Sequence, residues 1–344
     1  MIKDFFEWFE NWEANKNFEQ LDLSSNGFFA SGISNVSKGL VSVSGGNYYI
    51  KTPHSRAYKF GYVNLRFEAE DNQLATMSEL IAQKRYKKFR FLYANHRPIY
   101  RPRTVLGELD FEVLWKNRHV YNFEEMYRRG LYTLVSPSID SEYVDTISMG
   151  DITTIGLQLT KHNKEEQTMY DNFEKVLDCK QYYLKYMTEN CYDNFVKFVI
   201  ASIFEFSDDD HFDNILLCKN RQNEMYEDLF LFDKESTAFN PFVALNMDIG
   251  AIKYRVQNHA SYNGMPISKQ GERSLARMYE LTRLVRLGKL EKKYVDFLNE
   301  IAGIDFNKIA KEIELETGLK TNQKQLDMYK YGADFAGIIA GKEH

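Results

Sequence analysis

The hydrophobic pattern of this 344-residue chain changes its period about one third of the way along. Between about residues 26 and 68, apolar side chains come in short runs typical of strands, such as 40–43 and 48–50. Gly45 and Gly46 lie between these two runs and indicate a hairpin turn, because glycine tolerates the positive φ of tight turns. A helix is expected where the spacing becomes helical, at 74–88. Further short strands are expected at 28–29, 62–67, 89–93 and 104–106.

From about residue 120 onward, the apolar spacing is mainly helical. The expected helices lie at 165–177, 181–206, 272–286, 291–301 and 306–316. A β-rich first third followed by a helical remainder predicts an α+β fold with two lobes. We expect a small N-lobe at 1–115, opened by a short helix at 1–18, and a larger helical C-lobe at 116–344.

Composition narrows the functional class. Hydrophobic residues make up 44% of the chain, enough for a proper core, and the net charge of −5 argues against nucleic-acid binding by bulk charge. The three cysteines are sparse and show neither a disulfide framework nor zinc-ligand spacing. No run of apolar residues is long enough for a membrane span, and the N-terminus lacks a signal-peptide pattern. A cytoplasmic protein is therefore expected, with secretion by a leaderless route left open.

The segment 207–217 carries the most chemical information. It places Asp209, His211 and Asn214 in an acidic loop that runs directly into apolar residues, and a second apolar run then ends at Asp233. Carboxylate and amide oxygens are the ligands that Mg²⁺ prefers, and kinase-type enzymes use such a loop and strand end against ATP phosphates. A calcium-binding loop or a solvated acidic turn is the alternative, although the EF-hand glycine and terminal glutamate are missing. His211 is expected to orient the loop by a hydrogen bond rather than to transfer a proton.

Two further groups suit phosphate binding. Lys51 ends an apolar strand, and Glu79 lies among apolar neighbours on the expected helix, where an unpaired carboxylate would be costly. An ion pair between Lys51 and Glu79 would explain both placements; a solvated lysine and a surface glutamate are the alternatives. The segment 31–39 lies between two strands and has small residues that let backbone N–H groups approach phosphate, although an ordinary surface loop has the same composition. Its candidate phosphate-binding residues are Gly32, Ser34, Ser37 and Gly39.

Together these motifs resemble the HipA-type bacterial Ser/Thr kinases and, more distantly, the phosphatidylinositol 3-/4-kinase-like enzymes. The catalytic loop of those families reads D-R-H-x-x-N, and 209–214 fits it with Asp210 in place of the arginine. The F-D-x-G-S-like turn that carries the metal ligand of those families is similar to 232–236, with Glu235 in place of the glycine. Lys51 resembles the strand lysine of those families, and Glu79 resembles their helix acid.

This resemblance implies a two-lobed protein-kinase-like fold that binds ATP and Mg²⁺. Lys51 would contact phosphates and pair with Glu79, and Asp209 would orient or deprotonate the acceptor hydroxyl. Asn214 and Asp233 would bind Mg²⁺. The acceptor would be a Ser or Thr of a protein, and the chain a bacterial toxin, effector or regulatory kinase. The serines of the phosphate loop (Ser31, Ser34 and Ser37) are candidates for autophosphorylation. A catalytically silent binding module and a lipid or small-molecule kinase are the alternatives.

A basic, aromatic segment at 84–103 gives a competing signal. It contains no acidic residue, and its aromatic side chains are interleaved with cations. Such a mixture suits nucleic acid, an acidic protein partner or an anionic lipid surface, and it also suits an ordinary solvated face. Its cations are Lys84, Arg85, Lys87, Lys88, Arg90, Arg97, Arg101 and Arg103.

Overall fold

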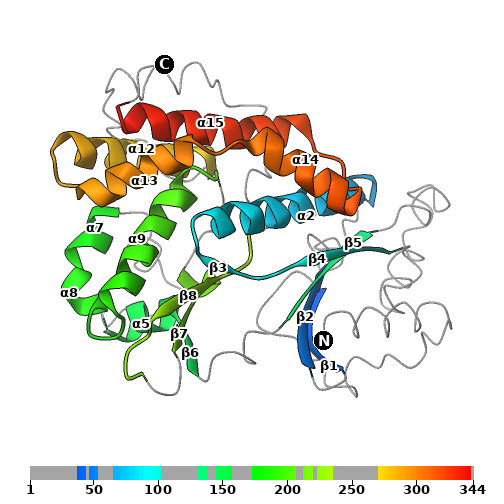
Figure 1. The fold of residues 1–344 in the computed structure, drawn as a ribbon, viewed down its shortest axis with the longest axis horizontal. Helices are drawn as coiled ribbons and strands as arrows, with labels where there is room; N and C mark the ends of the chain where they lie inside the picture. Colours follow the sequence, from blue (N-terminus) through cyan, green and yellow to red (C-terminus); the bar gives the residue numbers. More distant parts are fainter. Residues whose placement is uncertain are drawn as a thin grey trace. The chain divides into compact units, whose positions relative to one another are not determined.

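The structure is a computed structural model that contains two small β-sheets and a largely helical C-terminal part (Figure 1). The predicted α+β class is confirmed. The described residues are 37–43, 46–52, 65–101, 131–137, 145–156, 173–206, 212–219, 223–234 and 270–341. The chain forms two compact units: the first comprises Met1–Gln83 and Ala94–Glu142, and the second comprises Lys84–Tyr93 and Tyr143–His344. The lobe boundary expected at 115/116 and the helix expected at 1–18 lie outside the described residues.

The first unit contains an antiparallel four-stranded sheet with the strand order β1-β2-β5-β4. The predicted hairpin between the apolar runs at 40–43 and 48–50 is confirmed, with Val43 opposite Gly46 across the turn. The last two strands in this order come from a part of the sequence for which only 104–106 was expected to be a strand. The strands are β1 (Ser37–Val43), β2 (Gly46–Thr52), β4 (Arg97–Arg101) and β5 (Leu131–Pro137).

Helix α2 (Leu65–Lys88) starts earlier than expected, so the prediction of a strand at 62–67 is wrong from Leu65 onward. Its first half is attached to β5 through Asn72, which donates to the backbone oxygen of Tyr132 (3.0 Å) and accepts from the Tyr132 N–H (2.7 Å). Asn72 and Glu79 are two helical turns apart and both are buried, so they share one face of the helix. This face turns toward the interior of the first unit.

The second unit contains a separate four-stranded sheet with the order β3-β8-β7-β6. β3 runs parallel to β8, and the other neighbours are antiparallel. The strands predicted after Asn214 and before Asp233 are confirmed as β7 and β8, whereas β6 was not expected. The strands are β3 (Leu92–Tyr93), β6 (Asp145–Ser148), β7 (Ile215–Lys219) and β8 (Asp228–Leu231).

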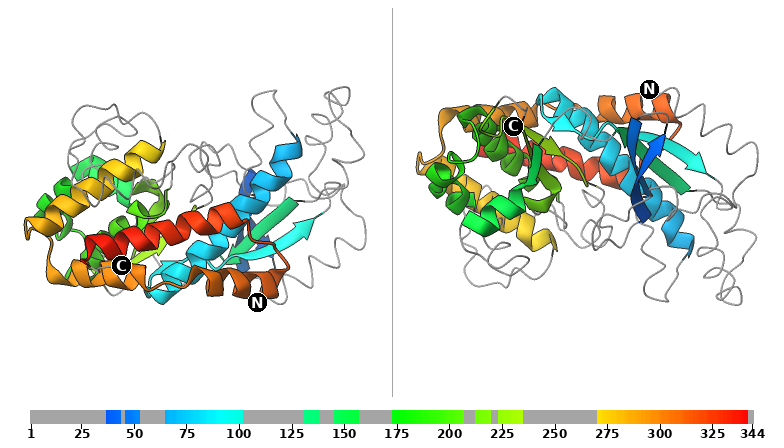
Figure 2. Two further views of the ribbon diagram at one scale, coloured as in Figure 1. Left: turned by 90° about the horizontal axis from the view of Figure 1, so that it is seen from above. Right: turned by 90° about the horizontal axis from the view of Figure 1, so that it is seen from below.

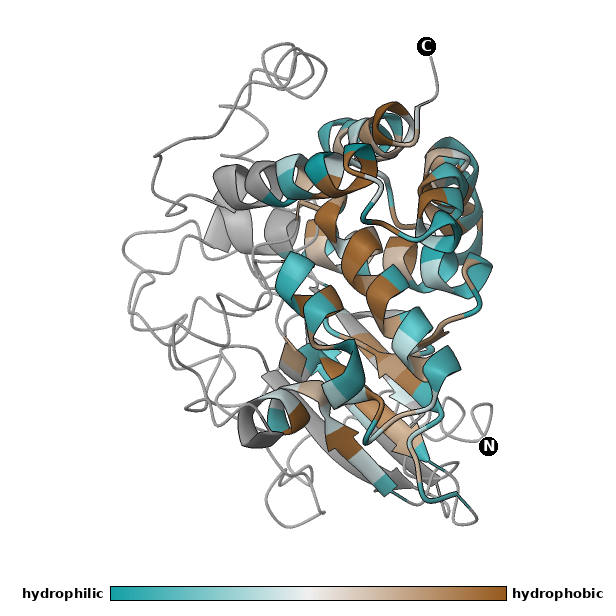
Figure 3. Ribbon diagram, turned by 90° about the vertical axis from the view of Figure 1, so that its left-hand side faces the viewer, coloured by the Kyte–Doolittle hydropathy of each residue, from teal (hydrophilic) through white to brown (hydrophobic). Residues whose placement is uncertain are grey.

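Helices cover this second sheet. α9 (Glu189–Ile203) is the most buried of them and contacts β8 on one side and the helices α12 and α13 on another (Figure 1). α15 packs along α13, as both views of Figure 2 show. Hydrophobic and hydrophilic residues lie on opposite sides of the same helices in Figure 3, which is the pattern expected of helices packed on a core. The remaining helices are α5 (Met149–Gly156), α7 (Phe173–Asp178), α8 (Lys180–Tyr183), α12 (Gln270–Arg286), α13 (Lys292–Ala302), α14 (Phe306–Thr317) and α15 (Gln323–Ile339).

The single helix expected at 181–206 is interrupted. α8 ends at Tyr183, and a short bridge between Met187 and Tyr226 precedes α9. The Thr188 hydroxyl accepts the backbone N–H of Cys191 and thereby caps the new helix. The hydrophobic period continues through the break, which is why the sequence alone suggests one helix. Among the described helices, none has the length and apolar character needed to cross a membrane.

Candidate functional site

Lys51 and Glu79 form a buried ion pair in the first unit. Lys51 lies on β2, which is an inner strand of its sheet, opposite Leu134 of β5. Its Nζ atom lies 2.7 Å from Oε1 of Glu79, and the two side chains are 3% and 0% exposed. The pairing expected from the sequence is therefore present, and neither the solvated lysine nor the surface glutamate describes the structure.

His96 is a neighbour of this pair that the sequence analysis missed. Its Nε2 atom lies 3.6 Å from Oε2 of Glu79, and the side chain is buried. Gln83, one turn after Glu79 on α2, accepts the His96 backbone N–H (2.9 Å) and donates to Asn95 (3.0 Å). The carboxylate of Glu79 thus lies between a lysine and an imidazole. No ligand spacing in the sequence marks His96, because the contact depends on how the chain returns to α2.

Two residues of the candidate phosphate loop lie in a strand. Ser37 and Gly39 belong to β1, where they pair with Thr52 and Ile50 of β2. Gly32 and Ser34 lie outside the described residues, as do Asp209 and His211 of the acidic loop. A phosphate-binding role for these residues stays a prediction.

Asn214 and Asp233 lie at the same end of the β7–β8 pair in the second unit. Asn214 ends the 3-10 helix η5 (Phe212–Asn214), directly before β7. Ile215 pairs with Leu231, and the Phe232 backbone N–H donates to the backbone oxygen of Asn214 at 3.4 Å. Asp233 is the next residue. Asn214 and Asp233, which are distant in the sequence, are therefore neighbours at one end of this strand pair. Both carry side-chain oxygen atoms.

Asp233 has a left-handed backbone with φ 63°. This conformation costs a residue with a Cβ atom about 1–2 kcal/mol, although Asp tolerates it better than most. Strained backbone of this kind is concentrated at functional sites. β8 ends two residues earlier, at Leu231, so the conformation of Asp233 belongs to the turn that follows the strand.

A second buried charged group surrounds Glu205, just after α9, and the sequence analysis missed it. We call Arg85, Tyr86, Glu205 and Lys234 the Glu205 cluster. Glu205 Oε1 accepts from Arg85 Nη1 at 2.6 Å and from the Tyr86 hydroxyl, and Glu205 Oε2 lies 3.2 Å from Lys234 Nζ. All four side chains are buried, and one carboxylate faces two cations.

Tyr86 is the neutral hydrogen-bond donor of the Glu205 cluster. Burial and the charge of Glu205 raise the pKa of Tyr86 well above its ordinary value, so the phenol keeps its proton and donates a hydrogen bond to the carboxylate. Arg85 also donates to the Ala201 backbone oxygen (3.0 Å), and the Lys234 ammonium lies 4.7 Å from the centre of the Phe198 ring. The sequence signal was present but faint: Glu205 lies between two phenylalanines at the end of an apolar helix.

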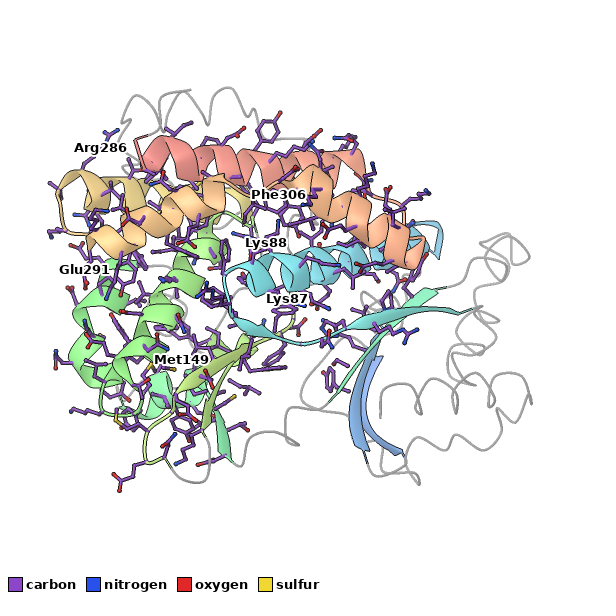
Figure 4. All side chains as sticks on the ribbon, viewed as in Figure 1. Lys87, Lys88, Met149, Arg286, Glu291 and Phe306 are labelled. Atoms are coloured by element: carbon purple, nitrogen blue, oxygen red, sulfur yellow. The ribbon has the colours of Figure 1, made fainter. Side chains whose placement is uncertain are left out.

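The basic segment 84–103 is divided between structural and exposed cations. Lys84 forms an ion pair with Glu316, and Arg85 belongs to the Glu205 cluster. Lys87 and Lys88 are exposed at the end of α2, where Figure 4 labels them, and Arg90 follows in the next turn. The part of this segment left for a partner is smaller than the sequence suggests.

Comparison with known proteins adds little. No protein-family model and no curated protein matches the sequence. A proinflammatory kinase of Helicobacter pylori, CtkA, is similar in structure, with a TM-score of 0.48 and 14% identity over 91% of this chain and 94% of that chain. A similarity at this level assigns no activity, so the roles of the residues have to be argued from their own geometry.

The described residues contain no group of three or more His, Cys, Asp or Glu side chains arranged to hold a metal ion. The side chains of Asn214 and Asp233 offer two oxygen atoms of the kind Mg²⁺ prefers, which would suit an ion that takes its remaining ligands from phosphate and water. Mg²⁺ at a nucleotide site is bound in this way, through one or two carboxylates plus substrate phosphates. The residues present therefore fit Mg²⁺ held together with a nucleotide better than a closed protein metal site.

Proposed function

We propose that this chain is a kinase that uses ATP and Mg²⁺ to transfer the γ-phosphoryl group to a hydroxyl. The observation that carries the proposal is the buried Lys51–Glu79 pair, which joins an inner strand to a helix at 2.7 Å. A lysine on a strand, held by a glutamate on a helix, is the arrangement with which protein kinases hold ATP phosphates. A buried ion pair is weak support for stability, since apolar residues of similar size often do as well, so a functional reason for this pair is favoured.

The remaining roles follow from the chemistry of each side chain. Lys51 would neutralise charge on the phosphates, and Glu79 would keep its ammonium group in place. Asn214 and Asp233 would hold Mg²⁺, which when bound neutralises charge on the phosphate oxygens. Asp209 would orient or deprotonate the attacking hydroxyl, and His211 would fix the loop that carries it. The backbone of the phosphate loop (Gly32, Ser34, Ser37 and Gly39) would approach the triphosphate.

The acceptor is the least constrained part of the proposal. The resemblance to HipA-type kinases favours a Ser or Thr of a protein, and with it a role as a bacterial toxin, effector or regulator. Asp210 and Glu235 occupy positions where the related families carry arginine and glycine. These two departures favour a silent nucleotide-binding module as the second candidate, which would bind ATP without turning it over.

Binding of a fluorescent ATP analogue, measured with and without Mg²⁺, tests the proposal. The wild type is expected to bind in a Mg²⁺-dependent manner, and Asp233→Ala is expected to lose most of that dependence. Asp228→Ala is the matched control, because Asp228 lies at the opposite end of the same strand and is not a proposed ligand. Identical binding by all three proteins would contradict the metal role of Asp233. If the wild type binds no ATP analogue at all, the proposed kinase function is wrong.

Turnover separates the candidates that remain. Incubation with γ-labelled ATP should label the protein itself or a protein substrate if the acceptor is Ser or Thr. Label that appears in an inositol lipid would indicate the lipid kinase instead. Mg²⁺-dependent ATP binding with no transfer to protein, lipid or water would favour the silent module.

A further inference from the structure

The Glu205 cluster lies directly beside the proposed metal ligand. Lys234 is the residue after Asp233, and its ammonium group is held by Glu205 at 3.2 Å and by the ring of Phe198. On the other side of Asp233, β8 is fixed by pairing of Leu231 with Ile215. Asp233 therefore lies between two anchored neighbours, and its left-handed backbone joins them.

The other partner of this ion pair also adjoins a residue with a left-handed backbone. Glu205 is followed by Phe206, which has a left-handed backbone with φ 52° and leads into the segment 207–211. Each partner of the Glu205–Lys234 pair thus stands next to a residue in a sparsely populated conformation. Unfavourable backbone persists only where the surrounding contacts over-determine it. A buried ion pair with two further donors, Arg85 and Tyr86, supplies such contacts.

We propose that Glu205 and Lys234 are positioning residues that fix the direction of the Asp233 carboxylate for Mg²⁺. The inference rests on the proposed function, because it assigns the metal to Asp233. Neither residue touches the metal; Lys234 acts through the backbone it shares with Asp233, and Glu205 acts through Lys234. Groups that hold a ligand in place commonly change metal affinity about 10- to 100-fold when they are removed.

Lys234→Met is the sharpest test of this role. It removes one cation from a cluster in which one carboxylate faces two, so Glu205 keeps Arg85 as its partner. The affinity for Mn²⁺, used as a spectroscopic substitute for Mg²⁺, is measured by electron paramagnetic resonance with a non-hydrolysable ATP analogue present. We expect affinity to fall about 10-fold or more in Lys234→Met. Asp233→Asn should lose it to at least the same extent.

Lys293→Met provides the matched control. Lys293 also pairs with a carboxylate of α9, Asp193 at 2.7 Å, but it stands next to no proposed ligand. The Mn²⁺ affinity of the Lys293→Met protein should equal that of the wild type. Hydrogen exchange gives a second readout: Lys234→Met should speed exchange in the peptide that contains Asp233, whereas Lys293→Met should leave that peptide unchanged.

Tyr86→Phe removes one donor to Glu205 without changing any charge, and it decides the question if Lys234→Met does not fold. A weakened Mn²⁺ affinity in a folded Tyr86→Phe protein supports the inference. If Asp233→Asn loses the ion while the folded cluster variants bind it as the wild type does, the positioning role is overturned and the kinase proposal stands. If the wild type holds no more Mn²⁺ than the nucleotide alone, both proposals fail together.

Discussion

Each unit of this protein buries a carboxylate beside a cationic side chain, and the two groups differ in the number of cations that face the carboxylate. Glu79 in the first unit lies 2.7 Å from one lysine, with His96 as a second neighbour at 3.6 Å. Glu205 in the second unit holds both Arg85 and Lys234 and accepts from a tyrosine. In the first group, one lysine and one imidazole face the carboxylate. The second has more cations than carboxylates, so Glu205 is the residue that keeps it together.

The largest loss of stability is expected when Glu205 is removed, because two buried cations face it. Glu205→Ala leaves two buried cations without their carboxylate, which should lower the free energy of unfolding by about 3–5 kcal/mol. Asp193→Ala is the matched control, since Asp193 also holds a lysine and a tyrosine but is partly exposed, and it should cost only about 1 kcal/mol. Urea unfolding measures both. Equal losses would show that burial of the Glu205 cluster does not matter.

A double variant separates stability from chemistry in the first group. Lys51→Met leaves Glu79 buried beside an apolar side chain and should cost about 3 kcal/mol of unfolding free energy. Adding Glu79→Gln removes the uncompensated charge and should restore most of that stability. ATP turnover should be lost in both variants, because the missing ammonium group is needed by the phosphates. Turnover that returns with stability would mean that the pair is only structural.

Close packing behind Glu205 is expected to have an intermediate effect. Gly332 of α15 lies against the backbone carbonyl of Phe204, well inside the distance that a Cβ atom requires. Gly332→Ala should therefore force the residues next to Glu205 to shift, at a cost of about 1–3 kcal/mol. Gly303→Ala is the control, because a Cβ atom there would meet its nearest atoms at an ordinary 3.5 Å. Thermal unfolding of the two variants gives the comparison, and a tolerated Gly332→Ala would show that α15 can move away from Phe204.

The smallest change in stability is expected for the exposed ion pair between Lys84 and Glu316, which lies next to the Glu205 cluster on α2. Lys84 precedes Arg85 on α2 and pairs with Glu316, whose side chain is 57% exposed. Glu316→Gln should change the unfolding free energy by less than about 1 kcal/mol, because solvent screens the charges of an exposed pair. The loss should shrink further at high salt. A loss as large as that of Glu205→Ala would remove the distinction between buried and exposed pairs that the account uses.

The features that the sequence predicts are those with local signals. Lys51 and Glu79 each interrupt an apolar run, so their pairing was expected before the structure. α14 has Asp305 as its N-cap and Gly318, with a left-handed backbone, at its C-terminal end, and its observed bounds agree with the expected 306–316. In both cases the signal lies in a few residues that are close together in the sequence.

The features that the sequence does not predict depend on contacts between distant residues. The alternating apolar pattern at 62–67 suggests a strand, but from Leu65 the chain is helical, and this helix is tied to β5 by Asn72. Arg85 and Glu205 are 120 positions apart, and no spacing rule connects them. His96 reaches Glu79 where the chain returns to α2, and there Gln83 accepts the His96 backbone N–H. Tertiary contacts of this kind override local preference.

Transfer of label from γ-labelled ATP tests the central claim most directly. It is measured with Mg²⁺ for the wild type and for the Lys51→Met/Glu79→Gln double variant, after equal stability of the two proteins has been established. We predict Mg²⁺-dependent transfer to a hydroxyl by the wild type and none by the double variant. Equal transfer by the two folded proteins, or none by either, would contradict the role given to the buried lysine.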